Sequence, residues 1–187
     1  MSLGERLYRF RSFWIFPLLA IALIYTTAHA ELEHQNIELI WLLPIGIFCW
    51  TLLEYGLHRF VFHLHLNWRS PGFRDFMNAS HVGHHHAPRD PDKLHVHPTF
   101  GLFVSALLFV LIFALTRSLF TTSGVLSGIW AGFLYYESVH YRVHLTSSPA
   151  GLIAGQRRFH FHHHFVNARQ CFGVTSPLWD YVFGTHK

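Results

Sequence analysis

Histidine is the residue type in this chain best suited to binding metal ions. The 187 residues include 18 histidines, and ten of these fall into four clusters. The clusters are His58 and His63; His81, His84 and His85; His140 and His144; and His160, His163 and His164. A transition-metal ion takes about four to six nitrogen or oxygen donors. Ten histidines therefore match the needs of two metal ions held mainly by neutral imidazole.

Spacing within the clusters indicates how they could act together. Residues three and four apart share a face of an α-helix, so the last three clusters could each direct their imidazoles one way. His58 and His63 are five apart and would point about 140° away from each other on an ideal helix. This pair requires a helix end or a bend between its members. Any single cluster could be a histidine-rich surface, but four clusters at ligand spacing favour a metal centre.

The elements that position these clusters are expected to be membrane helices. The chain is 51% hydrophobic and 13% charged, and a mean hydropathy of +0.24 is too high for an ordinary soluble domain. Apolar stretches cover residues 13–30, 37–57, 100–115 and 119–136, each near the roughly 20 residues that cross a bilayer core. Four spans is the simplest interpretation. The short third stretch leaves open a hairpin that crosses only partly.

Basic residues predict the orientation of these spans. Arginine and lysine concentrate before the first span, between the second and third, and after the fourth, which the positive-inside rule places in the cytoplasm. All four histidine clusters then lie on the cytoplasmic side, as one shared centre requires. The first span also resembles a secretory signal peptide that ends near Ala30, but its cleavage would leave the later topology unchanged.

Two carboxylates lie one helical turn before ligand candidates. Glu54 precedes His58 by four residues, and Glu137 precedes His140 by three. Acids in such positions accept the second ring N–H of a metal ligand and fix its tautomer, so we expect this role for both. The alternative is that they are interfacial acids paired with arginine.

Cysteine and charge exclude other classes of site. Cys49 and Cys171 are predicted to be free, buried thiols, and the chain has no Cys-x-x-Cys motif for an iron–sulfur or zinc-finger site. The net charge of +4 suits an anionic membrane surface. No segment predicts nucleic-acid binding.

Five motifs together resemble the fatty acid hydroxylase superfamily. They are EYGLHRFVFH at 54–63, HVGHHHAPRD at 81–90, HYRVH at 140–144, HFHHHF at 160–165 and FGVTSPLWDYVFGT at 172–185. They are most similar to the fatty acid 2-hydroxylases that act on the acyl chains of sphingolipids. The resemblance covers residues 54–185 in the family's order.

Membership implies an all-α fold in which residues 1–187 form a single domain. It would be a four-helix integral membrane protein with a cytoplasmic helical cap that encloses a di-metal histidine centre. The implied ligands are the ten clustered histidines, and the implied cofactors are two iron ions, with zinc possible in purified protein, and dioxygen as co-substrate. His86 and His162 lie beside implied ligands at positions where the family does not require histidine, which leaves them open as alternative ligands. The remaining histidines match no motif and are expected at interfaces or in solvent: His29, His34, His65, His95, His97 and His186.

The implied reaction is hydroxylation of a lipid acyl chain, at carbon 2 of a fatty acid or ceramide-type lipid. No segment resembles the cytochrome b5 domain fused to eukaryotic members, so we expect a separate cytochrome b5- or ferredoxin-like donor with its reductase. The expected location is the bacterial inner membrane or the endoplasmic reticulum. A desaturase or a carotenoid or sterol hydroxylase would share the metal core. A metal transporter or a haem protein fits less well, because the histidines gather at one membrane edge and exceed what two haem ligands need.

Overall fold

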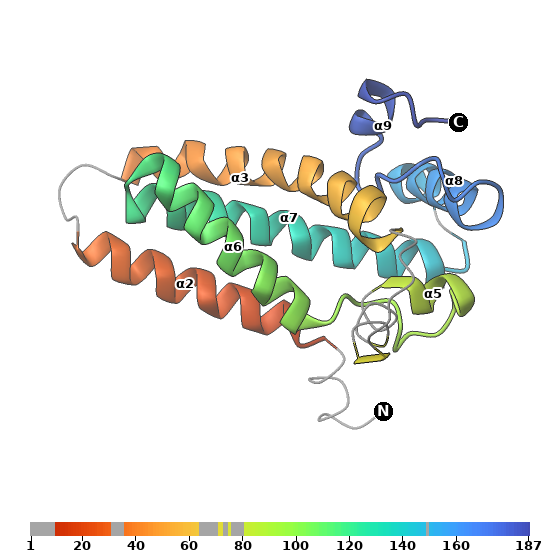
Figure 1. Ribbon diagram of the computed structural model, residues 1–187, viewed down its shortest axis with the longest axis horizontal. Helices are drawn as coiled ribbons and strands as arrows, with labels where there is room; N and C mark the ends of the chain where they lie inside the picture. The colour runs from red at the N-terminus through yellow and green to blue at the C-terminus, as the bar shows by residue number, and fades with distance from the viewer. Residues whose placement is uncertain (1–9, 31–35, 64–70, 73–74, 76–80, 149) are drawn as a thin grey trace. The chain divides into compact units, whose positions relative to one another are not determined.

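The computed structural model describes residues 10–187, apart from 31–35, 64–70, 73–74, 76–80 and 149. Helices and no strands occur in these residues, which confirms the all-α prediction. The helices are α2 (Ser12–Ala30), α3 (Asn36–Gly56), η1 (Leu57–Phe62), α5 (Gly83–His86), α6 (Pro98–Thr116), α7 (Leu119–Leu145), α8 (Gly151–Phe165) and α9 (Leu178–Val182) (Figure 1).

The chain divides into two compact units. The first comprises Met1–Trp50 and Pro98–Leu134, and the second comprises Thr51–His97 and Tyr135–Lys187. Helices α3 and α7 each begin in the first unit and end in the second. The ten clustered histidines all belong to the second unit.

Aromatic side chains hold the helices of the first unit together. Phe16 of α2 lies with its ring centroid 5.7 Å from that of Trp130 and 5.2 Å from that of Phe133, both on α7. Trp50 of α3 meets the same Phe133 at 5.4 Å, and the Trp130 indole donates a 2.8 Å hydrogen bond to Ser105 of α6. Helix α7 is therefore the central helix of this unit.

A glycine pair sets the closest approach of α3 and α7. A Cβ atom added to Gly46 would lie 2.2 Å from the carbonyl oxygen of Val125, and one added to Gly128 would lie 2.3 Å from that of Leu43. Such small residues let membrane helices pack backbone to backbone. No larger side chain fits here without separating the helices.

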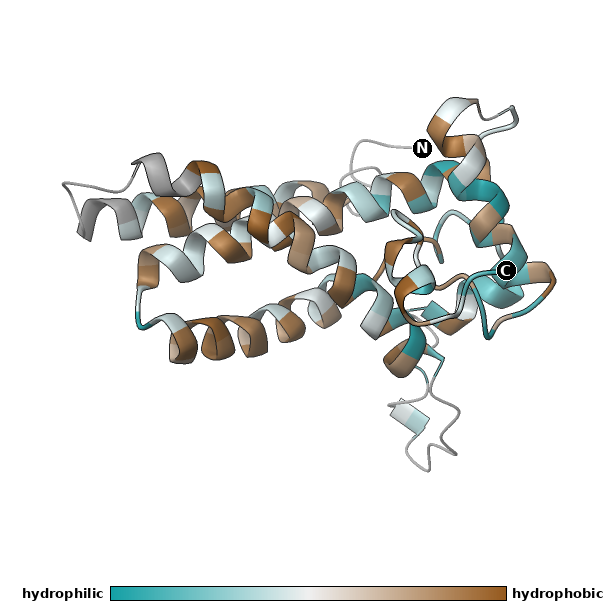
Figure 2. Ribbon diagram, turned by 90° about the horizontal axis from the view of Figure 1, so that it is seen from above, coloured by the Kyte–Doolittle hydropathy of each residue, from teal (hydrophilic) through white to brown (hydrophobic). Residues whose placement is uncertain are grey.

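Among the residues that the structure describes, two helical segments are long and apolar enough to cross a membrane, namely Ile40–Phe62 and Pro98–Thr116, and α2 adds a shorter apolar segment, Ser12–Thr27. Large apolar side chains of α6 are exposed, including Phe103, Leu107 and Val110. Figure 2 shows few strongly hydrophilic residues along this helix. These features suggest membrane localisation.

The second unit has its own aromatic core. Tyr55 is 1% exposed, and its ring lies 5.9 Å from that of Phe172 and 5.3 Å from that of Phe183.

Both cysteines are free, as predicted, but only Cys171 is buried. Cys49, on α3, is exposed, which differs from the prediction.

Candidate metal centre

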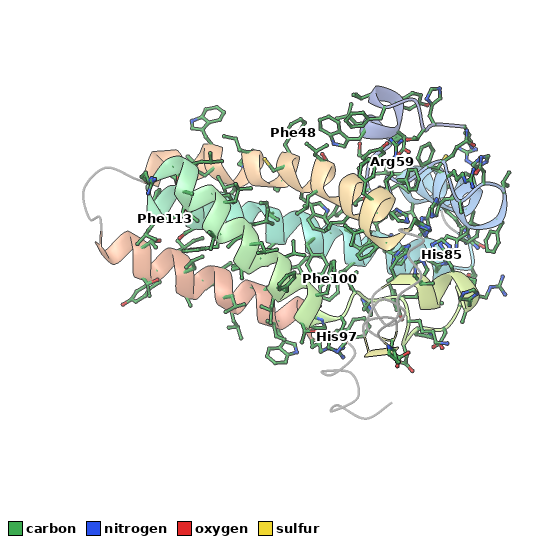
Figure 3. The ribbon with its side chains drawn as sticks, viewed as in Figure 1. Phe48, Arg59, His85, His97, Phe100 and Phe113 are labelled. Carbon is green, nitrogen blue, oxygen red and sulfur yellow. The ribbon has the colours of Figure 1, made fainter. Side chains whose placement is uncertain are left out.

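The ten clustered histidines converge in two groups of five. Within each group the ring nitrogens that could bind a metal all lie within 4.8 Å of one another, and Figure 3 shows nitrogen-rich side chains gathered around the labelled His85. The first group is His58, His63, His81, His85 and His163, and the second is His84, His140, His144, His160 and His164.

Local helix geometry explains how His58 and His63 reach one group. Residues Leu57–Phe62 form a π-helix, and His63 follows at its end. A π-helix bonds residue i to i+5 and so brings residues five apart to the same side. The two rings lie 5.0 Å apart. The sequence spacing required a bend or a helix end, and the chain supplies a π-helix that ends at this point.

Two segments serve both groups at once. His81 and His85 are four residues apart and enter the first group, whereas His84 enters the second. Helix α8 likewise gives His163 to the first group, and His160 and His164 to the second. The rings of His85 and His164 stack at 4.1 Å, so the two groups are in direct contact.

Backbone carbonyls fix the tautomers of four of these histidines. Because a carbonyl oxygen can only accept, the Nδ1 atom facing it must carry the proton, which leaves the lone pair of a neutral ring on Nε2. The Nδ1–H donors and their acceptors are His58 to Phe172, His84 to His81 at 2.7 Å, His140 to Leu94 at 2.9 Å, and His163 to Gln170 at 2.8 Å.

The lone pairs of two of these rings, those of His84 and His140, face each other, which is the arrangement a cation requires. The Nε2 atoms of His84 and His140 both lack a proton and lie 3.2 Å apart. Two such acceptors cannot hydrogen-bond to each other, and their repulsion is relieved when a positive ion lies between them. The Nε2 atom of His58 is buried and has no hydrogen-bond partner. The residues therefore fit a metal site in each group.

Burial keeps the candidate ligands neutral. Loss of solvent, aided by neighbouring imidazoles, lowers the pKa of His85 to about 3 and holds the pKa of His84 well below its usual range. Burial also lowers the pKa of His163 to about 4, although its hydrogen bond to Gln170 acts in the opposite direction. Only a neutral imidazole can bind a metal, so these rings are ready to do so at neutral pH.

Glu54 and Glu137 contact backbone segments whose carbonyl groups accept hydrogen bonds from candidate ligands. Glu54 accepts hydrogen bonds from the N–H groups of Val174 and Thr175, at 2.6 and 2.9 Å. These residues follow Phe172, whose carbonyl accepts from His58. The sequence had suggested a direct bond from Glu54 to the ring, but the ring N–H points to this carbonyl instead.

Glu137 has an equivalent arrangement beside His140. It accepts a 2.9 Å hydrogen bond from the N–H of Val96 and a further hydrogen bond from the ring of His95. The neighbouring Leu94 carbonyl accepts from the His140 ring. Each carboxylate thus holds a backbone segment whose carbonyl orients a histidine.

The histidines outside the motifs have varied surroundings. His95 is expected at an interface or in solvent, and its side chain is 11% exposed and pairs with Glu137. His162 contacts Gln170 at 3.1 Å, and His186 is exposed and stacks on Tyr181. His86 is exposed, and His97 is partly buried. The side chain of His29, together with His34 and His65, lies outside the described residues.

Sequence reasoning also missed Asp180. This residue is 0% exposed, and its carboxylate accepts hydrogen bonds from the N–H groups of Phe172 and Gly173. Asp180 is the one acid in the apolar run LWDYVF. An ionisable residue is seldom fully buried without partners, so its place in that run was the available signal.

Comparison with known proteins identifies similar families, relatives and structures. The profile of the fatty acid hydroxylase family matches residues 43–185. The chain is 32% identical to the ceramide very long chain fatty acid hydroxylase of Saccharomyces cerevisiae, over 94% of this chain and 46% of that protein. It is 34% identical to a dihydroceramide fatty acyl 2-hydroxylase of Arabidopsis thaliana, over 85% of this chain and 65% of that protein.

Two further matches extend the comparison. Human fatty acid 2-hydroxylase is 32% identical over 77% of this chain and 39% of its own length. A solved structure of full-length Scs7p, with only the hydroxylase domain visible, superposes with a TM-score of 0.77 at 32% identity. That match covers 93% of this chain and 66% of the other. The chain spans about half the length of the yeast relative.

Proposed function

Since this chain belongs to the fatty acid hydroxylase family, we propose that it hydroxylates the acyl chain of a lipid. The proposed target is carbon 2 of a fatty acid or ceramide-type lipid, because its relatives are ceramide, dihydroceramide and fatty acid 2-hydroxylases. The observation that carries the proposal is the pair of five-histidine groups with converging ring nitrogens. This donor set suits an oxygen-activating metal centre better than a structural thiolate site.

The proposed ligands are the ten histidines, five for each of two iron ions. Imidazole also accepts zinc, so purified protein can carry zinc in the same places. Bound iron would supply the activation of dioxygen and the removal of hydrogen from an unactivated methylene group. The balanced reaction converts the methylene, dioxygen, two electrons and two protons into the hydroxylated chain and water.

The protein's own part is to hold the ligands in place and exclude water. His84, His160 and His163 are at most 1% exposed, and carbonyl acceptors orient two of these rings. A preformed dry site of this kind avoids reorganisation during the reaction. We propose that Glu54 and Glu137 support it by holding the segments that carry the acceptor carbonyls of His58 and His140.

We propose that α2, α3, α6 and the first part of α7 form a four-helix membrane anchor. The histidine groups would then lie in a cytoplasmic cap, as the distribution of basic residues favours. Because α3 and α7 continue from one unit into the other, residues 1–187 would act as a single hydroxylase domain. An acyl chain would enter from the bilayer while its polar head stays at the membrane surface.

The electrons would come from a cytochrome b5- or ferredoxin-like carrier with its reductase. Such a carrier would deliver them from the cytoplasmic side, where the histidine groups are proposed to lie. The other expected partners are the membrane and the lipid substrate.

Lipid mass spectrometry tests the proposed reaction. Cells that express the chain should gain lipids with one added oxygen on the acyl group, and fragmentation should place it next to the carbonyl. His84→Ala should abolish this product, whereas the matched His162→Ala variant should retain it. A loss of two hydrogens would identify a desaturase, and oxygen on a sterol or carotenoid would overturn the substrate.

A further inference from the structure

Four consecutive backbone N–H groups, those of residues 172–175, donate to two carboxylates. Asp180 accepts the first two, at 2.9 and 2.8 Å. Glu54 accepts the next two, at 2.6 and 2.9 Å. Asp180 is 0% exposed and Glu54 is 4% exposed, and charge-assisted bonds are strong in such surroundings. The two acids therefore fix the path of this segment.

One peptide group in the segment connects Asp180 with His58. The N–H of Gly173 donates to Asp180 Oδ2, and the carbonyl of Phe172 accepts from His58 Nδ1. This N–H and this carbonyl belong to the same planar peptide group. Asp180 and His58 thus bind opposite sides of one rigid unit, so the carboxylate fixes the direction of the acceptor that orients the ring.

The same peptide also transmits charge. A carboxylate that accepts from an N–H polarises the peptide and strengthens its carbonyl as an acceptor, because linked hydrogen bonds reinforce one another. A stronger acceptor on Nδ1–H makes Nε2 of His58 a better metal donor. Nε2 of His58 is buried without a hydrogen-bond partner, so its lone pair is available to a metal ion. A stronger donor at this atom would bind that ion more tightly.

The surroundings of Asp180 and Gly173 leave little freedom. The Thr185 hydroxyl donates to Asp180 Oδ1 at 2.7 Å and lies 3.0 Å from the Tyr55 hydroxyl, to which the Arg59 guanidinium donates. A Cβ atom on Gly173 would lie 2.0 Å from a carbonyl oxygen and 3.0 Å from Asp180 Oδ2. These contacts therefore hold the peptide group between Phe172 and Gly173, and the Asp180 carboxylate that binds it, in one arrangement.

We propose that Asp180 is a positioning residue for His58, acting through the peptide group between Phe172 and Gly173. It strengthens the binding of the metal held by the first histidine group. This inference rests on the proposed metal centre but not on the proposed substrate. Its test therefore measures metal binding rather than hydroxylation.

The test uses the purified full chain and zinc ions titrated in competition with a chromophoric chelator. Wild type should bind two zinc ions per chain. Asp180→Asn should weaken one of them by about 10- to 100-fold, the usual effect of losing a group that supports a ligand, and leave the other unchanged. The control is Trp179→Phe, which removes the indole hydrogen bond to Thr51 from the same short helix and should keep both affinities.

A double-mutant cycle separates positioning from a merely structural role. In a His58→Ala background, Asp180→Asn should cause no further loss, because the ring it positions is absent. A loss as large as in wild type would overturn the inference, as would unchanged affinities with only a lower thermal midpoint. Should Asp180→Asn fail to fold, Thr185→Val must give a smaller loss confined to one ion, and unchanged binding again overturns the inference. Fewer than two ions in wild type would instead overturn the metal centre itself.

Discussion

His58 and His63 have ring centroids 5.0 Å apart, although five residues separate them along the chain. An α-helix would point these side chains in different directions, about 140° apart. The π-helix over Leu57–Phe62 reduces this mismatch, because its wider turn, with hydrogen bonds from residue i to i+5, brings residues five apart closer to one side. A rare backbone conformation therefore gives the first histidine group two of its members.

Replacement of single ligands should distinguish metal donors from their neighbours. His81→Ala, His144→Ala and His163→Ala should each abolish activity and lower the metal content, because each removes a donor from one group. His86 and His162 belong to neither group, so the His86→Ala and His162→Ala variants should each still bind two ions. Elemental analysis provides the measurement. An inactive, metal-free His86→Ala variant beside an active His85→Ala variant would show that the ligand register is wrong.

Glu137→Gln should weaken the second metal site without emptying the first. The substitution removes the carboxylate charge that holds the Val96 N–H and the His95 ring, so the Leu94 carbonyl should orient His140 less firmly. We expect about a 10- to 100-fold loss in affinity for one ion, measured by chelator competition. Asp90→Asn changes a partly exposed acid paired with Lys93 in the same unit and should bind both ions normally. Equal binding by the two variants would contradict this role for Glu137.

The sequence predicted that the ten clustered histidines would come together, because eight of them are spaced three or four residues apart, as one face of a helix requires. It also indicated that His58 and His63 need a bend or a helix end. It did not indicate that His84 joins a different group from His81 and His85, because that depends on how separate helices pack. The sequence also did not indicate which carbonyl accepts the hydrogen bond from His58, because every residue has the same backbone carbonyl group.

The close contact between α3 and α7 should tolerate no added methyl group. Gly46→Ala would place a Cβ atom 2.2 Å from a backbone oxygen, and overpacking of this kind costs about 1 to 3 kcal/mol or more. Its thermal midpoint should fall. Gly155→Ala on α8 meets nothing within 4 Å and should raise the midpoint, because alanine favours a helix by about 1 kcal/mol over glycine. Equal midpoints would contradict the backbone contact.

The metal-free protein should lose stability in acid. Burial lowers the pKa of His85 to about 3 and that of His163 to about 4, whereas the unfolded chain takes up these protons near pH 6.5. Stability should therefore be constant above about pH 6.5 and fall as the pH drops toward about 4, since the unfolded state then binds more protons. Thermal midpoints measured across this range provide the check, and His85→Gln should flatten the dependence. A flat profile in the unsubstituted protein would show that the imidazoles are not held neutral by burial.

Oxygen-isotope labelling tests the central claim most directly. Purified protein is supplied with iron, an electron carrier with its reductase, a ceramide-type lipid and ¹⁸O₂, and the product is fragmented by mass spectrometry. We predict one ¹⁸O atom on carbon 2 of the acyl chain, with no product from His84→Ala and normal product from His162→Ala. A double bond without added oxygen, or a hydroxyl oxygen derived from water, would contradict the assignment of this chain as an oxygen-dependent lipid hydroxylase.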